Sequence, residues 1–387
     1  MNDRALRHVV VGLGDGNGPA REDAFDITAA SEVMAVLCLA RDRADLKQRL
    51  GRLLVGFDVD DRPVFARDLG AVRPMAVLLR DALMPNLVQT IEGGPALVHG
   101  GPFANIAHGA SSLVATRLGL AQADVVVTEA GFGSDLGAEK FFDIVCRTGE
   151  VWPRAAVLVA TCRALKWHGG ASAEALALPD VAALRRGLSN LSAHVDNLRA
   201  FGFDPVVAVN QFATDSEDEL SVVESFCRDR GLACARADAF GGGGAGCEAL
   251  GRAVIRAVES GPTVPRFLYP LEDTPTQKIA AIGRRLYGAA DVAFVGSTSQ
   301  DLQLIHRLEL ERLPVCIAKT QASLSDDPSR RGRPQGFTLS IREIRPAIGA
   351  GFLIAYAGPV TTMPGLPREP AALGLDIDDG GVVHGLY

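Results

Sequence analysis

Polar side chains gather in two glycine-rich segments of the chain. The segments are His99–Pro102 and Glu129–Gly133, and each stands where an apolar stretch ends and a helix is expected to begin. Glycines let the backbone approach a ligand closely and adopt positive φ. The polar residues of the region are Asn105, His108, Thr128, Glu129, Asp135, Glu139 and Lys140. One such loop indicates only an ordinary α/β turn, but two together favour a site that binds a polar ligand and moves protons.

The elements that would position these residues follow from the apolar pattern. Ser111–Leu120 has apolar residues at helical spacing, and Val125–Val127 predicts a short strand. Ala155–Ala160 and Pro205–Asn210 are almost uninterrupted apolar runs, which is typical of parallel strands covered on both faces. The alternation of strands and helices predicts an α/β fold with a doubly wound, mostly parallel sheet. Its ligand edge collects the residues that follow each strand.

Composition narrows the class of protein. The 387 residues are 48% hydrophobic and 22% charged, with a formal net charge of −7, so we expect a globular protein and no general nucleic-acid binding. No apolar run approaches the length that spans a bilayer, so we expect no membrane partner. Seven scattered cysteines predict reduced thiols in a cytoplasmic protein. The cysteines and histidines lack ligand spacing, so no metal site is predicted.

Four segments resemble one family of enzymes. The stretch 99–143, together with Arg21–Thr28, Lys319–Pro328 and Met363–Pro367, closely resembles formate–tetrahydrofolate ligases, also called formyltetrahydrofolate synthetases. The resemblance extends over nearly the whole chain. It implies an enzyme that makes formyl phosphate from formate and ATP, and then passes the formyl group to N10 of tetrahydrofolate. It also implies ATP with Mg²⁺ and a monovalent cation as cofactors, tetrahydrofolate and formate as substrates, and a homo-oligomer.

One motif of the family is absent from these residues. The family holds ATP with a loop of the type G-x-x-x-x-G-K-[ST], whose lysine reaches the phosphates and whose hydroxyl binds Mg²⁺. Gly241–Cys247 is rich in glycine but has no lysine followed by Ser or Thr. We therefore expect a large sheet that is incomplete at its N-terminal side, and an impaired ATP-dependent reaction. The alternatives are a non-catalytic folate-binding or assembly protein, and one half of a split ligase with a separate P-loop chain.

The resemblance also implies three domains. Residues 1–192 would be the remainder of a large P-loop-type α/β domain. Residues 193–285 would be a second α/β domain that contributes to the folate site, and residues 286–387 a third.

Within this scheme, the resemblance assigns Phe212 to stacking on the pterin ring, for which an aromatic ring is well suited. The alternative is a loop phenylalanine that fills a crevice. A second stacking residue, a tryptophan in the family, falls at Asp238 in an ungapped comparison, and Phe240 two residues later could replace it. We count Asn105 and Asp135 among the substrate-binding candidates.

The catalytic candidates are His108, Lys166, His168 and Glu129. Lys166 and His168 belong to a loop that lies at the active site in the family, where they could bind phosphate or transfer a proton. The alternatives are a solvated basic turn for this loop and a helix-side hydrogen-bond donor for His108. Glu129, Asp135 and Glu139 could orient a cation or the amine of the folate.

Overall fold

The computed structural model describes residues 3–261 and 264–385 of the chain. Its internal contacts divide the chain into two compact units, one formed by residues 1–31 and 361–387 and the other by residues 32–360. The expected three domains, with boundaries near residues 192 and 285, stay a prediction.

The smaller unit joins the two ends of the chain through short elements. These are the helical turns η1 (Arg4–Arg7), η2 (Thr28–Ala30) and η7 (Ala371–Gly374), and the strands β1 (Val9–Val11), β2 (Arg21–Asp23), β14 (Asp376–Ile377) and β15 (Val383–His384). The pairs β1–β2 and β14–β15 are antiparallel. Arg7 Nε donates to the carbonyl of Met363 over 2.7 Å, so the turn at Met363–Pro367 is tied to the first residues of the chain.

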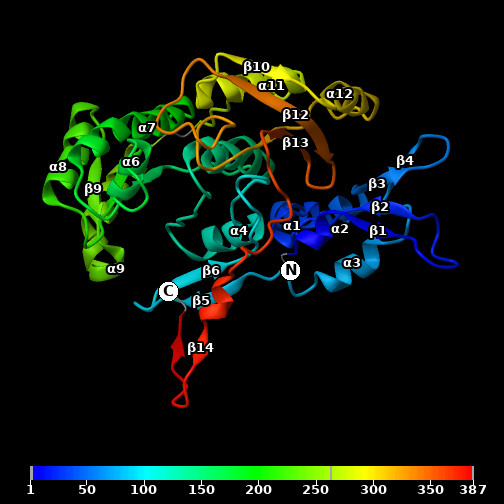
Figure 1. The fold of residues 1–387 in the computed structure, drawn as a ribbon, viewed down its shortest axis with the longest axis horizontal. Helices are drawn as coiled ribbons and strands as arrows, with labels where there is room; N and C mark the ends of the chain where they lie inside the picture. Colours follow the sequence, from blue (N-terminus) through cyan, green and yellow to red (C-terminus); the bar gives the residue numbers. More distant parts are fainter. Residues whose placement is uncertain (1–2, 262–263, 386–387) are drawn as a thin grey trace. The chain divides into compact units, whose positions relative to one another are not determined.

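A three-stranded parallel sheet in the larger unit contains both predicted strands, but only the run Pro205–Asn210 is central and buried. The run Ala155–Ala160 was wrongly expected to be covered on both faces: it forms an edge strand in which Val157 and Val159 are exposed. The order of the sheet is β7 (Val157–Ala160), β8 (Val206–Asn210) and β9 (Cys234–Ala237). The first four residues of β8 are buried because the strand is central and is covered by α8 (Glu217–Asp229) and α10 (Glu248–Ser260), while α7 (Val181–Ala200) packs against β7. Figure 1 shows α6 (Cys162–His168), α7 and α8 gathered around this sheet.

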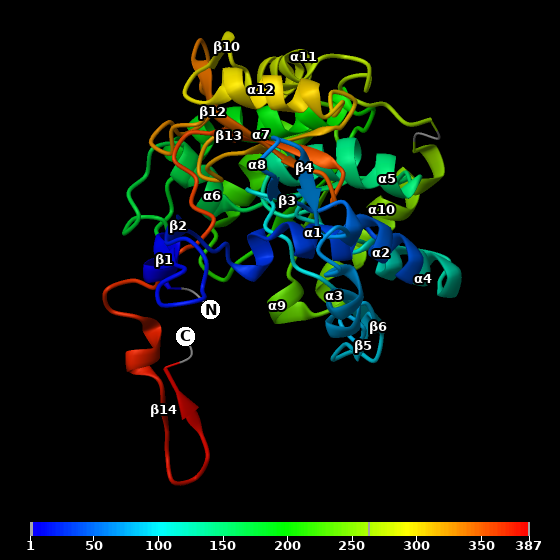
Figure 2. The same cartoon turned by 90° about the vertical axis from the view of Figure 1, so that its right-hand side faces the viewer.

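A second, mixed sheet lies in the last third of the larger unit. Its order is β10 (Asp291–Phe294), β12 (Thr338–Ala347), β13 (Phe352–Ala357) and β11 (Val315–Ala318), with β12 and β13 antiparallel. The helices α11 (Pro275–Ile282) and α12 (Thr298–Arg307) pack against it, as both views show (Figures 1 and 2). Ile317, Leu339 and Leu353 are fully buried in a core that also takes in Phe142 and Phe201.

The remaining elements are short helices and two antiparallel hairpins. The helices are α1 (Glu32–Leu39), α2 (Arg43–Gly51), α3 (Val72–Leu78), α4 (Leu113–Gln122), α5 (Arg147–Gly149) and α9 (Ala239–Gly242), with η3 (Ser134–Ala138), η4 (Phe141–Cys146), η5 (Ala245–Cys247) and η6 (Gly283–Tyr287). The hairpins pair β3 (Leu54–Phe57) with β4 (Pro63–Phe65), and β5 (Asn86–Gln89) with β6 (Pro95–Val98).

The predicted α/β class is confirmed, but a doubly wound sheet is not. The described strands form six separate sheets of two to four strands. The strand expected at Val125–Val127 was wrong: these residues form no strand, and Val125 and Val127 are exposed. A β-branched run becomes a strand only where a neighbour offers backbone partners. No helix within the described part of the chain combines the length and the apolarity needed to cross a bilayer.

Candidate functional site

The carboxyl edge of the three-stranded sheet carries Phe212. The ladder continues one residue past β8, because the Gln211 N–H donates to the Ala237 carbonyl over 2.9 Å. A four-residue turn then leads to α8, whose N-cap Ser216 forms a capping box with Glu219. Within the turn, Phe212 N–H donates to Asp215 Oδ2 over 2.9 Å, and Asp215 N–H donates to the Phe212 carbonyl over 3.0 Å. The side chain of Phe212 is 47% exposed, so it is available to a flat ligand.

The neighbouring strand carries Asp238 and Phe240 to the same edge. Phe240 is fully exposed, and therefore has no packing role among the described residues. Asp238 caps α9, with its Oδ1 accepting from the Gly241 N–H over 2.8 Å. Phe212 and Phe240 thus follow adjacent parallel strands of one sheet.

The glycine-rich loop 241–246 does not have the features of a nucleotide phosphate site. Its Gly241 N–H is occupied by Asp238, and its Gly244 N–H donates to Glu92 Oε1 over 2.6 Å. Carboxylates at these amides would repel phosphate oxygens, and the loop has no lysine to neutralise them. In the described part of the chain, no group of three His, Cys, Asp or Glu side chains is placed to hold a metal ion.

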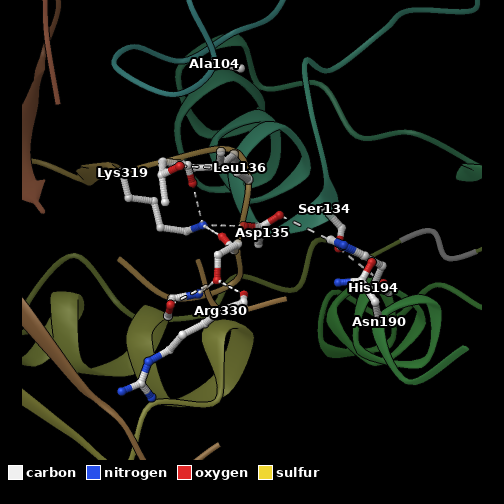
Figure 3. Close-up of polar contacts among 12 residues, drawn as sticks. Ala104, Ser134, Asp135, Leu136, Asn190, His194, Lys319 and Arg330 are labelled. Atoms are coloured by element: carbon white, nitrogen blue, oxygen red, sulfur yellow. Dashed lines mark hydrogen bonds and ion pairs between the residues drawn. The ribbon is translucent and has the colours of Figure 1, made fainter. Parts of the chain in front are cut away.

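The second glycine-rich segment leads into a buried ion pair (Figure 3). Asp135 on η3 is 5% exposed, and its Oδ2 lies 2.7 Å from Lys319 Nζ. The Lys319 ammonium also donates to the carbonyls of Thr320 and Ser323. Burial raises the pKa of Asp135, but the nearby Lys319, together with His194 and Lys140, holds that pKa below its usual range. The contacts of Asp135 favour a structural role, and its predicted role in substrate binding stays a prediction.

His194 on α7 completes this cluster (Figure 3). Its Nδ1 lies 2.8 Å from Ser134 Oγ and 3.9 Å from Asp135 Oδ1, and burial lowers its pKa. The Gly332 N–H donates to His168 Nδ1 over 3.2 Å, so the loop that begins at Lys319 also reaches the predicted active-site loop. Burial lowers the pKa of His168 to about 4, which keeps the imidazole neutral near pH 7.

Lys166, the other candidate on that loop, points into the protein. The Lys166 Nζ lies 3.1 Å from Glu219 Oε1 and donates to the Leu178 carbonyl over 2.9 Å. Burial raises the pKa of Glu219, but hydrogen bonds from the backbone N–H groups of Asp180 and Ser216 lower it to about 2. These contacts make Lys166 an anchor between α6 and α8.

His108 and Glu139 are buried without hydrogen-bond partners among the described residues. Burial lowers the pKa of His108 to about 3, with smaller contributions from Lys140 and Arg49. Burial also raises the pKa of Glu139 well above its usual range. His108 is therefore neutral near pH 7, burial disfavours the charged form of Glu139, and neither side chain reaches solvent.

The remaining candidates lie closer to the surface. Glu129 is exposed and Asn105 is half-buried, with the Asn105 carbonyl accepting from the Lys319 N–H over 3.2 Å. A further candidate is Phe132 in the second glycine-rich segment, which was not predicted from the sequence. Its side chain is 57% exposed and its φ is +62°. Such backbone strain costs about 1–3 kcal/mol and clusters at ligand sites; the sequence signal is an aromatic residue between two glycines.

The comparisons with known proteins agree over the full chain. The sequence profile described as "Formate--tetrahydrofolate ligase" matches residues 1–387. The chain is 55% identical over 390 residues to a formate–tetrahydrofolate ligase of Myxococcus xanthus, covering 100% of this chain and 71% of the relative. It is 53% identical over 388 residues to that of Bacillus licheniformis, with 100% and 69% covered, and 54% identical over 388 residues to that of Paracoccus denitrificans, with 100% and 70% covered. Since the profile and these relatives each match the whole of this chain, it belongs to the formate–tetrahydrofolate ligase family.

Proposed function

We propose that this chain binds tetrahydrofolate at the carboxyl edge of β7–β8–β9, as the substrate of a formate–tetrahydrofolate ligase. The observation that carries the proposal is the half-exposed Phe212 on a hydrogen-bonded turn, in a chain that matches the family over its whole length. The aromatic face would stack on the pterin, and Phe240 on the adjacent strand would supply the second face. Asn105, Asp238 and Glu129 are the polar candidates in the proposal, because none of these three is fully buried.

We expect the ATP-dependent step of the family's reaction to be impaired in this chain. In the family, ATP bound with Mg²⁺ activates formate as formyl phosphate before N10 of the folate attacks it. The sequence has no G-x-x-x-x-G-K-[ST] motif, and carboxylates occupy amides of its glycine-rich loop. We therefore propose that 387 residues with this sequence bind folate but perform ATP-dependent ligation slowly.

The missing motif also favours two other arrangements for the chain. It could act with a separate P-loop polypeptide as half of a split ligase, or serve as a non-catalytic folate-binding or assembly protein. Added P-loop polypeptide that restored ligation would support the first, and folate binding without any ligation would support the second. In either arrangement we propose a cytoplasmic homo-oligomer, with formate and formyl phosphate as the other small-molecule partners; light scattering measures the oligomeric state.

Separate titrations test the proposal. Anaerobic calorimetry with tetrahydrofolate should show binding by the chain, and Phe212→Ala should weaken it about fivefold to 150-fold, the range for one stacked ring. Phe25→Ala is the matched control, since Phe25 is an exposed phenylalanine of the smaller unit. Tight MgATP binding together with no response to tetrahydrofolate would overturn the proposal.

A further inference from the structure

The turn between β8 and α8 is held by hydrogen bonds at both of its ends and within it. It is four residues long, from Phe212 to Asp215, and lies between two rigid attachments. The Gln211 N–H is bonded to the Ala237 carbonyl at one end, and the Ser216 capping box begins α8 at the other. The turn that carries Phe212 is therefore held at both ends before any ligand binds.

Two hydrogen bonds inside the turn involve the same pair of residues. Asp215 Oδ2 accepts from the Phe212 N–H, and the Phe212 carbonyl accepts from the Asp215 N–H. Only the side-chain hydrogen bond can be removed by a substitution, because the backbone hydrogen bond can form with any residue at position 215 except proline. Without the carboxylate oxygen, the Phe212 N–H has no partner within the turn, and the ring gains freedom that ligand binding must then remove.

We propose that Asp215 is a positioning residue for the folate site: its carboxylate holds the backbone of Phe212 so that the exposed ring is preorganised for the pterin. Asp215 acts through Phe212 and does not touch the substrate. The inference rests on the proposed function of Phe212 and adds the residue that sets its geometry.

The same geometry identifies a position that would stiffen the turn further. Ala213 and Thr214 are its two central residues, and neither has a positive φ, as a type I turn requires. Proline is favoured at the first central position of such a turn, because its ring fixes φ near the required value. Ala213→Pro would therefore preorganise Phe212 from the other side of the turn.

The test compares tetrahydrofolate dissociation constants in the full chain. Asp215→Ala should weaken binding about threefold to tenfold, a part of the effect of losing the ring. Asp215→Asn should bind like the wild type, because its amide oxygen can accept the same N–H bond. Ala213→Pro should tighten binding about twofold to fivefold, from the reduced flexibility of the unbound turn.

Ser216→Ala is the matched structural control. It removes the neighbouring N-cap of α8 and lowers the melting temperature, but leaves both hydrogen bonds of the turn in place. Folate affinity unchanged in Ser216→Ala but reduced in Asp215→Ala separates positioning from general destabilisation.

The outcomes also separate this inference from the function on which it rests. If Phe212→Ala binds tetrahydrofolate as the wild type does, the proposed function fails. If Phe212→Ala weakens binding and Asp215→Ala does not, the function stands and the positioning role is overturned. Equal losses in Asp215→Asn and Asp215→Ala would also overturn it, since the charge and not the hydrogen bond would then matter. Binding by Ala213→Pro that is no tighter than that of the wild type would contradict the preorganisation.

Discussion

The Lys319 ammonium lies 2.7 Å from the Asp135 carboxylate, although 184 residues separate them in the sequence. Lys319 is fully buried and its three N–H donors each have an acceptor, in Asp135, Thr320 and Ser323. The pair connects the helix that follows the second glycine-rich segment to the loop that reaches His168.

Breaking this ion pair should be costly. Lys319→Met leaves Asp135 buried and uncompensated, and should lower the free energy of unfolding by about 3–5 kcal/mol. The double variant Lys319→Met/Asp135→Leu should recover most of the loss, since a buried pair replaced by apolar groups is often neutral. Urea denaturation measures both, and equal losses in the single and double variants would contradict the expectation. Arg312→Ala, which removes an exposed pair with Glu272, is the control and should cost less than about 1 kcal/mol.

His108 should make the protein less stable in mild acid. The pKa of His108 is about 3 in the folded chain, against about 6.5 in an unfolded one. Below pH 6.5 the unfolded state therefore binds a proton that the folded state does not, and stability falls as the pH falls towards 3. Between pH 6.5 and pH 5 this amounts to about 2 kcal/mol.

His108→Leu should remove that contribution. Its urea midpoint should change less between pH 7 and pH 5 than that of the wild type. His306→Gln is the control, because the His306 side chain is exposed and its loss should leave most of the pH dependence. A pH profile of His108→Leu that matched the wild type would show that this histidine titrates normally.

Lys166 should contribute to the stability of the fold but not to tetrahydrofolate binding. Lys166→Met breaks the buried pair with Glu219, so we expect a loss of about 3–5 kcal/mol in the free energy of unfolding. Tetrahydrofolate affinity, measured below the midpoint of unfolding, should be unchanged. Reduced affinity in a variant that kept its stability would instead place the ammonium on the ligand.

Tetrahydrofolate affinity should depend on the size of the aromatic ring at position 240. Phe240→Ala should weaken tetrahydrofolate binding about fivefold or more, and Phe240→Trp should strengthen it, because stacking grows with the area of the ring. Phe240 is fully exposed, so both variants should keep the melting temperature of the wild type. Affinities that did not change in either variant would leave Phe212 as the single aromatic face.

The sequence predicted the elements whose signal is local. Pro205–Asn210 was expected to be a buried parallel strand from its apolar run, and β8 is one because strands pair with it on both sides. Val125–Val127 has the same β-branched character but no neighbouring strand, which no local pattern could reveal. The apolar content of a strand can be read from sequence, whereas its pairing cannot.

The burial of the polar residues likewise could not be predicted from the local sequence. Asp135, Glu139 and Lys140 were expected to crowd a ligand edge, but all three are buried. Their burial depends on the packing of distant segments, as the contact of Asp135 with Lys319 shows. Asp215 was overlooked because its signal, an aspartate three residues after an aromatic, has meaning only once the turn is known.

The pairing of β8 with strands on both sides limits how this part of the gene can change. Inserting or deleting one residue within β8 would shift the strand residues that follow the change to the opposite face of the sheet. The exposed stretch 123–129 carries no ladder and has no such restriction. Length variation should therefore be tolerated in that stretch and rejected ahead of Phe212.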